Sequence, residues 1–333
     1  MVEMKWIFIL WLGLFVSVAV YAEPENNSPS FQLFLQQTKQ QLGQKYTYPS
    51  QWLDSQFSTI KRFYDFRPAK TVTDEPLAFG HITLEHYLPA RFTSEQIEYG
   101  AQLLVQHGAL LQRLQQQYGV QPRFLVALWG ALSNYALSQD AYPMLSVVAS
   151  KVFAQQLPMS ELIAALDLVK HFPTQTWVTE RQGVIAPIGF SPSRLQQFGQ
   201  DGNGDGVLDI RHSVADMLAS LAYFLQQQGW QAEQTWGRQV KLPALFKAEY
   251  GMAHSASFAY WQNLGVRRFD GGNLPKRQDM QISLLRPDGA TGRHYLVYDN
   301  YRALYAWQND HYFALSVSYL SERLKLKFRQ LKK

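Results

Sequence analysis

The chain has 333 residues, of which 47% are hydrophobic, 17% are charged and 14% are aromatic, and it contains no cysteine. This length allows one large domain or two modest ones, and the many aromatic residues exclude a largely disordered protein. Without cysteine there is no disulfide, zinc knuckle, iron–sulfur centre or thiol nucleophile. The net charge of +5 suits an anionic polymer as partner but is too small for a nucleic-acid-binding surface.

The first 22 residues are predicted to be a secretory signal peptide. Lys5 precedes an almost wholly apolar run over residues 6–20, and Val20-Tyr21-Ala22 has the form of a cleavage site. The apolar run is short for a membrane helix, which needs roughly 20 residues. We therefore expect cleavage near Ala22 and a soluble periplasmic protein, with an uncleaved inner-membrane anchor as the alternative.

The remaining sequence predicts a mainly helical protein. Helical spacing of apolar residues recurs over residues 31–67, 93–119, 124–135, 160–170, 213–228 and 314–329. Residues 71–89 are predicted to be extended or loop, and the alternation in residues 281–285 and 294–299 predicts a hairpin. We expect a helical domain over residues 23–242 and a small mixed α/β portion over residues 243–333 that completes the same module.

One acidic loop, within residues 201–216, has the spacing of an EF-hand calcium site. Oxygen ligands occupy positions 1, 3 and 5, a glycine occupies position 6, and a backbone carbonyl is available at position 7. The twelfth position is His212 in place of the usual bidentate glutamate, so a carboxylate further along must close the site. The predicted ligands of a weak Ca²⁺ site are Asp201, Asn203, Asp205, Val207 and Asp216. The alternative is a metal-free turn.

Several segments, each weak alone, occur in the order seen in a known family. They are residues 118–122, 126–130, 190–193, 201–222, 229–243, 296–301 and 307–315. Together they resemble the lytic murein transglycosylase B family, periplasmic enzymes that cleave peptidoglycan. The resemblance implies a mainly α fold with a lysozyme-like helical core, an EF-hand-like loop and a small mixed α/β C-terminal portion.

The segments that would carry catalysis depart from the family pattern. The family's Trp-Gly-x-Glu-Thr-x-x-Gly is Trp-Gly-Ala-Leu-Ser-Asn-Tyr-Ala at residues 129–136, so Leu132 occupies the glutamate position. The family's Gly-Ala-Met-Gly-Gln is Gly-Val-Ile-Ala-Pro at residues 183–187. In the family, one glutamate is taken to protonate the glycosidic oxygen and then to accept a proton from the sugar. Leucine can do neither.

The resemblance and its departures together predict a catalytically inactive relative. We expect it to bind peptidoglycan glycan strands, or proteins of cell-wall synthesis or remodelling, and no nucleic acid. The binding residues carried over from the family are Asn134, Tyr135, Phe190, Tyr223, Trp307 and Asn309.

Two alternatives remain open at the level of sequence. The first is an active lytic transglycosylase that cleaves the MurNAc–GlcNAc bond with a relocated acid, for which Glu180 and Asp310 are the candidates. The second is a protein-binding scaffold whose cleft is filled by Leu132, Ile185 and Tyr223.

Overall fold

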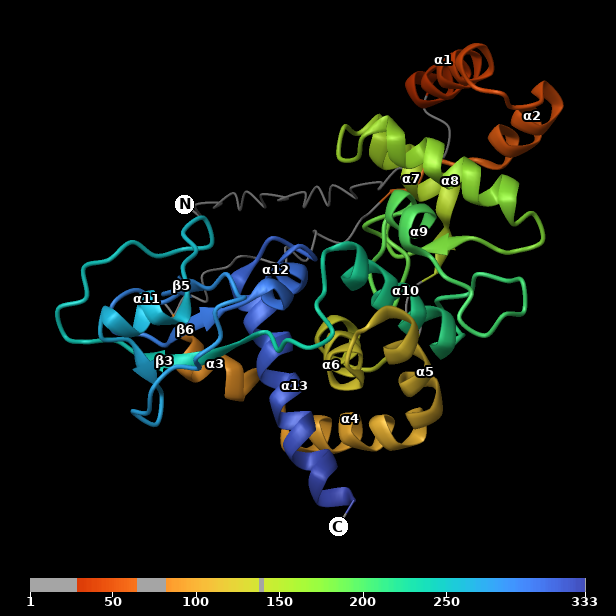
Figure 1. Ribbon diagram of the computed structural model, residues 1–333. Helices are drawn as coiled ribbons and strands as arrows, with labels where there is room; N and C mark the ends of the chain where they lie inside the picture. Colours follow the sequence, from red (N-terminus) through yellow and green to blue (C-terminus); the bar gives the residue numbers. More distant parts are fainter. Residues whose placement is uncertain (1–28, 65–81, 138–140, 333) are drawn as a thin grey trace, which may run out of the picture. The chain divides into compact units, whose positions relative to one another are not determined.

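The computed structural model describes residues 29–64, 82–137 and 141–332 (Figure 1). The predicted signal peptide lies outside these residues. The chain divides into two compact units, with the division between Arg62 and Phe63. Among the described helices, none combines the length and apolar character that a membrane span requires.

The first unit is a pair of helices, α1 (Pro29–Lys45) and α2 (Ser50–Thr59). An ion pair of 2.6 Å between Lys39 and Asp54 joins the two helices, and buried leucine and phenylalanine side chains line both. The sequence predicted one helical stretch here. The stretch is interrupted before Pro49, because the residue preceding a proline avoids the helical conformation.

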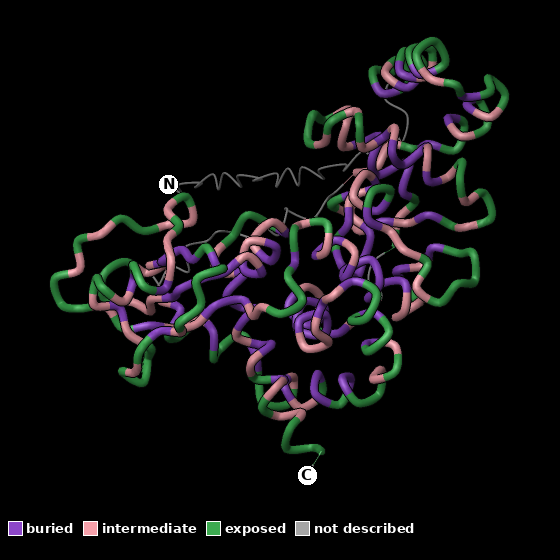
Figure 2. Tube along the Cα trace, in the orientation of Figure 1, coloured by how far each residue is buried: buried purple, intermediate pink, exposed green. Residues whose placement is uncertain are grey.

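The second unit is mainly helical, as predicted. Its helices are α3 (Leu84–Arg91), α4 (Ser94–Gln106), α5 (Gly108–Tyr118), α6 (Pro122–Ser133), α7 (Met144–Phe153), α8 (Met159–His171), α9 (Pro192–Phe198), α10 (Val214–Gln227), α11 (Phe258–Asn263), α12 (Asp299–Tyr305) and α13 (His311–Leu331). Helix α6 is the centre of this core: residues 124–131 are all buried, and α4, α5, α10 and α13 pack around it (Figures 1 and 2).

Helix α3 corrects one prediction from the sequence. Residues 71–89 were predicted to be extended or loop, but residues 84–89 belong to α3, and residues 65–81 lie outside the described part. Leu84 and Leu88, four residues apart, are both buried, and α3 packs against α13. The helix therefore depends on tertiary packing, which overrides a weak local propensity.

Two antiparallel sheets complete the second unit. Strands β1 (Tyr142–Pro143) and β2 (Val178–Thr179) form a short pair. The larger sheet has the order β4-β3-β6-β5, from β3 (Gly237–Lys241), β4 (Arg267–Arg268), β5 (Ser283–Leu285) and β6 (His294–Val297). Strands β5 and β6 confirm the predicted hairpin. The sheet begins at Gly237, before the expected boundary at residue 243.

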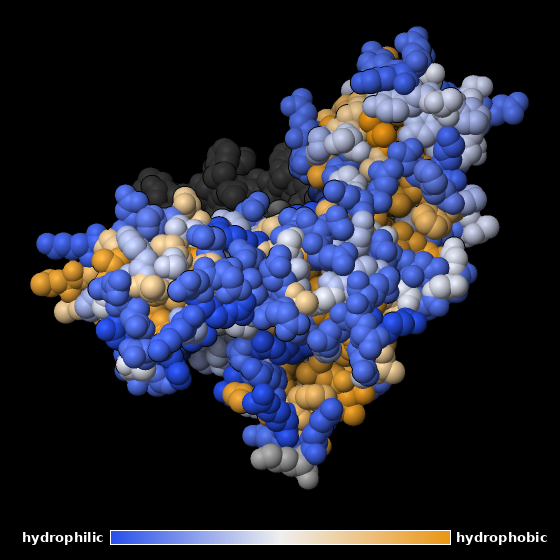
Figure 3. All heavy atoms as spheres, in the orientation of Figure 1, coloured by the Kyte–Doolittle hydropathy of each residue, from blue (hydrophilic) through white to orange (hydrophobic). Residues whose placement is uncertain are grey.

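Helix α13 returns the chain from the sheet to the helical core, where it packs along α6 and α4 (Figure 1). The Asp310 carboxylate caps its first turn by accepting the backbone N–H groups of Tyr312 and Phe313. The turn between α12 and α13 is held to α9, because the Arg194 guanidinium donates hydrogen bonds to the carbonyls of Trp307 and Ala306. The face in Figure 3 is mostly hydrophilic, with several smaller apolar areas, one of them over α4 and α5.

Candidate functional site

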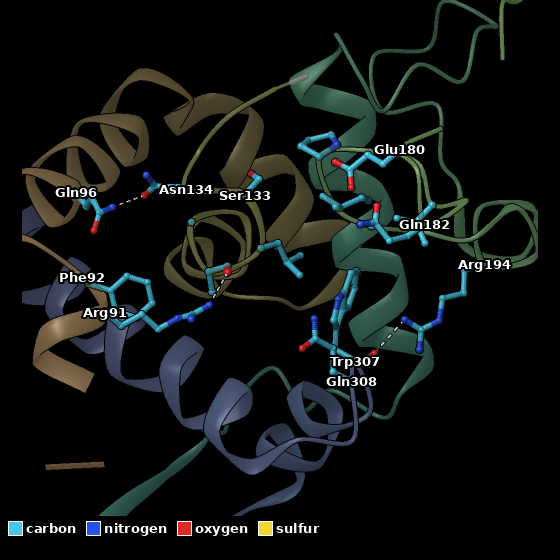
Figure 4. A pocket seen from close by; sticks show the side chains of 17 residues that line it. Arg91, Phe92, Gln96, Ser133, Asn134, Glu180, Gln182, Arg194, Trp307 and Gln308 are labelled. Atoms are coloured by element: carbon cyan, nitrogen blue, oxygen red, sulfur yellow. Dashed lines mark hydrogen bonds between the residues drawn. The ribbon is translucent and has the colours of Figure 1, made fainter. Parts of the chain in front are cut away.

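A cavity of about 770 Å³ opens in the second unit. One wall comes from the end of α6 and the start of α4, and the opposite wall comes from residues 180–189 and from α9 (Figure 4). The turn between α12 and α13 closes one end. The polar and charged side chains that line the cavity are Arg91, Gln96, Ser133, Asn134, Glu180, Gln182, Arg194 and Gln308.

Helix α6 presents its last turn to the cavity. The helix is fixed by burial on nearly all sides, and its C-terminal residues, Leu132 among them, line the cavity. Asn134 ends the helix in the left-handed conformation, with φ of 55°. Its side-chain oxygen accepts a hydrogen bond of 2.6 Å from Gln96, which is also the third residue of α4 and part of the capping box with Thr93. The predicted capping box thus also positions a residue of the site.

Tyr135 lies behind this wall and does not line the cavity. The residue is 6% exposed, and its ring packs edge-on against Tyr99 and Trp129, with ring centroids 5.6 and 5.9 Å away. A Cβ atom at Gly130 would lie 2.5 Å from this ring, and one at Gly100 would lie 2.2 Å from its hydroxyl. Tyr135 therefore packs between α4 and α6 and supports the end of α6, because Gly100 and Gly130 leave room for its ring.

The opposite wall carries a carboxyl group at Glu180. This residue follows β2, and its backbone N–H donates a 2.8 Å hydrogen bond to the carbonyl of Val184, which closes a tight turn. Glu180 lines the cavity, whereas Asp310 does not, because its carboxylate caps α13. Of the two candidate substitute acids, the structure brings Glu180 to the same cavity as Leu132.

An aromatic stack supports the end of the cavity that the turn between α12 and α13 closes. Trp307 lines the cavity and stacks on Phe190 with centroids 5.2 Å apart and planes at 22°, while Phe224 meets Trp307 edge-on at 4.7 Å. Phe190 is fully buried beneath Trp307 and does not reach the cavity. Its place in the stack holds the tryptophan in position.

Two further predicted binding residues lie outside the lining. Tyr223, on α10, packs against Tyr118 and Phe198 and does not line the cavity. Asn309, with φ of 55°, is exposed in the turn before α13. Of the six predicted binding residues, Asn134 and Trp307 line the cavity. Ile185, predicted as a filler of the cleft, is buried and also outside the lining.

The chain matches the family described as "Transglycosylase SLT domain" over residues 30–322. This protein belongs to that family. It is 24% identical to membrane-bound lytic murein transglycosylase B of Escherichia coli K12, over 90% of this chain and 84% of that protein. Its structure matches SltB3 of Pseudomonas aeruginosa in complex with NAG-anhNAM-pentapeptide, with a TM-score of 0.77, 27% identity, and 90% and 80% of the two chains covered. It also matches E. coli Slt35 in complex with calcium, with a TM-score of 0.71, 21% identity, and 90% and 94% covered.

These matches confirm the family and the lysozyme-like fold that the ordered motifs indicated. The sequence reasoning missed several polar residues that line the cavity, among them Gln182, Gln308 and the two arginines Arg91 and Arg194. Arg194 follows the recognised segment 190–193, so its position could have been found from that motif. Arg91 gave no such signal, because it ends a helix that the sequence did not predict.

The acidic loop lies apart from the cavity, before α10. The Asp201 carboxylate accepts the backbone N–H groups of Gly204, Asp205 and Gly206, and these bonds, the one from Gly206 foremost, lower its pKa. The Asn203 amide donates to the Asp205 carboxylate at 2.8 Å. Three of the predicted oxygen ligands therefore gather in one exposed turn.

Asp216 has a different setting from the other predicted ligands. It is buried, and its oxygens accept hydrogen bonds from the backbone N–H groups of Gly202 and Asp209 and from the Ser213 hydroxyl. Its carboxylate thus already has three donors and holds the loop to α10. Within the described residues, no three histidine or acidic side chains converge in a way that could hold a metal ion. Asp201 and Asp216 each accept three hydrogen bonds from the protein, but Asp201 lies in the exposed turn, whereas Asp216 is buried against α10.

Proposed function

We propose that this protein binds peptidoglycan glycan strands in the cavity without cleaving them. The observation that carries the proposal is Leu132, which lines the cavity at the family's glutamate position. Cleavage of a glycosidic bond requires a group that protonates the leaving oxygen, and leucine carries no such proton. SltB3, at 27% and 28% identity, has been solved with NAG-anhNAM-pentapeptide and NAG-NAM-pentapeptide, which supports peptidoglycan as the ligand class.

The lining of the cavity suits a sugar. Its volume of about 770 Å³ is within the usual range for small-molecule sites. Amide side chains at Gln96, Asn134, Gln182 and Gln308 can pair with hydroxyl and acetamido groups, and Trp307 adds an apolar surface. The open cavity favours ligand binding over a scaffold with a closed cleft. A periplasmic location, and cell-wall synthesis or remodelling proteins as further partners, belong to the same proposal.

A second candidate function is an active lytic transglycosylase that uses Glu180. The observation that favours it is the presence of the Glu180 carboxyl in the same cavity as Leu132. A relocated acid must come within hydrogen-bond reach of the glycosidic oxygen of the bound strand. The two candidates differ in their products, so one experiment separates them.

The test is incubation of the full mature protein with purified peptidoglycan, followed by mass spectrometry of the soluble products. The wild type is expected to sediment with the polymer and to release no anhydromuropeptides. Leu132→Glu should gain measurable release, because a general acid–base group contributes about 10²- to 10⁴-fold to rate. The matched control is Leu245→Glu, at a site 84% exposed and outside the cavity.

Release of anhydromuropeptides by the wild type would overturn the inactive assignment. Loss of that release in Glu180→Gln, with Glu233→Gln as the exposed control, would establish the second candidate. A wild type that neither sediments with peptidoglycan nor releases products would refute glycan binding itself.

We also propose a weak calcium site in the acidic loop. Asp201, Asn203 and Asp205 would supply side-chain oxygens and Val207 a backbone carbonyl, as their positions in the loop suggest. Asp216 would hold the loop in shape from beneath instead of binding the ion. Weak affinity is expected because a strong closing carboxylate is missing.

A further inference from the structure

The cavity carries more positive than negative charge. Arg91 from the end of α3 and Arg194 from α9 line it from different sides, and Glu180 is the one carboxylate in the lining (Figure 4). Two guanidinium groups and one carboxylate give a formal charge of +2 − 1 = +1. Neutral sugars do not require such an excess.

Arg194 is a half-buried cation without a matching anion. Its guanidinium donates to the backbone carbonyls of Trp307 at 3.0 Å and Ala306 at 3.5 Å, and it lies over the Trp307 ring at 5.8 Å. Burial lowers its pKa, while the nearby Glu161 carboxylate acts in the opposite direction. That carboxylate is bonded to the backbone and hydroxyl of Ser193 at 3.0 and 2.6 Å, and Arg194 forms no ion pair with any described residue.

Arg91, which is exposed to solvent, lies at the other side of the cavity. Its guanidinium donates to the Tyr87 hydroxyl and to the Ala131 carbonyl, both at 3.0 Å, and lies over the Phe92 ring at 5.5 Å. It too forms no ion pair within the described part of the chain.

Each guanidinium has donors left over for a ligand. An arginine side chain has five N–H groups in a planar fork, and each of these two uses two of them on protein acceptors. The bonds to carbonyl groups fix the direction of the fork. Arg194 is partly removed from water without a paired anion, which is costly, and an incoming carboxylate offsets that cost through charge-assisted hydrogen bonds. At the exposed Arg91 a carboxylate adds charge-assisted hydrogen bonds alone.

We infer that Arg91 and Arg194 bind carboxylate groups of the ligand, so that the cavity selects strands containing muramic acid over neutral glycans. The inference rests on the proposed function and names its specificity residues. A muramic acid unit bears a lactyl carboxylate, which is either free or extended by a peptide with its own carboxylates. N-acetylglucosamine has no such group. The recognised chemistry is therefore a carboxylate next to an N-acetylated sugar.

The test is calorimetric titration of the full mature protein with three ligands of equal sugar number. These are neutral chito-oligosaccharides, peptide-free glycan strands with lactyl carboxylates, and peptide-bearing muropeptides. At low salt, at least one acidic ligand should bind about tenfold more tightly than the neutral one, and added NaCl should reduce the difference. The acidic ligand that is preferred identifies the source of the carboxylate.

Two variants and one control locate the effect. Arg91→Gln and Arg194→Gln should each lose about tenfold in affinity for the acidic ligand and little for the neutral one. Arg329→Gln makes the same charge change at an exposed position of α13 outside the cavity, and it should change neither affinity. Circular dichroism checks that each variant is folded, and the wild-type comparison does not depend on any variant.

Equal affinity of the wild type for neutral and acidic ligands would overturn the inference and leave glycan binding intact. A preference that persists unchanged in folded Arg91→Gln and Arg194→Gln proteins would also overturn it. Binding of none of the three ligands would refute the proposed function together with the inference.

Discussion

Leu132 places an apolar side chain in the cavity wall, and the proposed function depends on its standing where the family pattern has a glutamate. A glutamate there would place a partly buried charge at the end of α6, and such a charge costs stability unless it is compensated. A leucine side chain carries neither that cost nor a proton to donate. Leu132→Glu is therefore expected to destabilise the protein even where it confers activity, so its folding should be measured beside its products.

Gly130 is a residue at which even one added methyl group should be harmful. A Cβ atom there would come within 2.5 Å of the Tyr135 ring, and Tyr135, with φ of 64°, has little freedom to move. We expect Gly130→Ala to lower the free energy of unfolding by about 2 kcal/mol, although alanine has the higher helix propensity. Urea denaturation measures this change.

The control for this substitution is Gly108→Ala, since Gly108 begins α5 and has no atom within 4 Å of a built Cβ. That variant should be as stable as the wild type or slightly more stable. If the two variants were equally stable, the Tyr135 ring would have room in solution for a methyl group at Gly130, and the close contact would be wrong.

At the scale of elements, the acidic loop and α10 are held together by Asp216. Removing its carboxylate would leave the N–H groups of Gly202 and Asp209 without their acceptor. We expect Asp216→Ala to lower the free energy of unfolding by about 3 kcal/mol, with or without Ca²⁺. Thermal unfolding in excess Ca²⁺ and in chelator measures both effects.

Asp205→Ala supplies the contrast, because Asp205 is exposed in the turn itself. It should abolish any calcium-dependent rise in the melting temperature and change the stability in chelator less than Asp216→Ala does. If Asp216→Ala destabilises the protein only in the presence of Ca²⁺, then Asp216 is a ligand and the structural role assigned to it is wrong.

Across the whole molecule, buried tyrosines make stability depend on alkaline pH. Burial raises the pKa of Tyr295 to about 12 and also raises the pKa of Tyr298 and Tyr301. The unfolded chain loses these protons near pH 10, so between about pH 10 and 12 the folded state binds more protons than the unfolded state. The free energy of unfolding should therefore be unaffected by these groups below pH 10 and should fall above it.

Urea unfolding at a series of pH values, with tyrosinate absorbance recorded in parallel, measures this dependence. Tyr295→Phe should flatten the fall in stability above pH 10, and Tyr260→Phe, at a 40% exposed position, should leave it unchanged. A stability that is constant up to pH 12 would show that these hydroxyl groups ionise as readily in the folded protein as in the unfolded chain.

The sequence by itself determined the features that depend on residues close together along the chain. The capping box at Thr93 and Gln96, the apolar α6 and the hairpin of β5 and β6 follow from local spacing, and the structure has all three. The ordered motifs gave the family. The sequence also shows directly that residue 132 is leucine and has no ionisable group, whatever the fold.

Only the tertiary structure decided which side chains reach the cavity. Phe190, Tyr135 and Tyr223 belong to motifs of the family, yet they support the site from behind or lie away from it. Arg91 and Arg194 were missed and line it. A motif fixes where a residue lies along the chain, but the direction of its side chain depends on elements that are remote in sequence. Arg194, for example, is oriented by carbonyl groups 112 and 113 residues away.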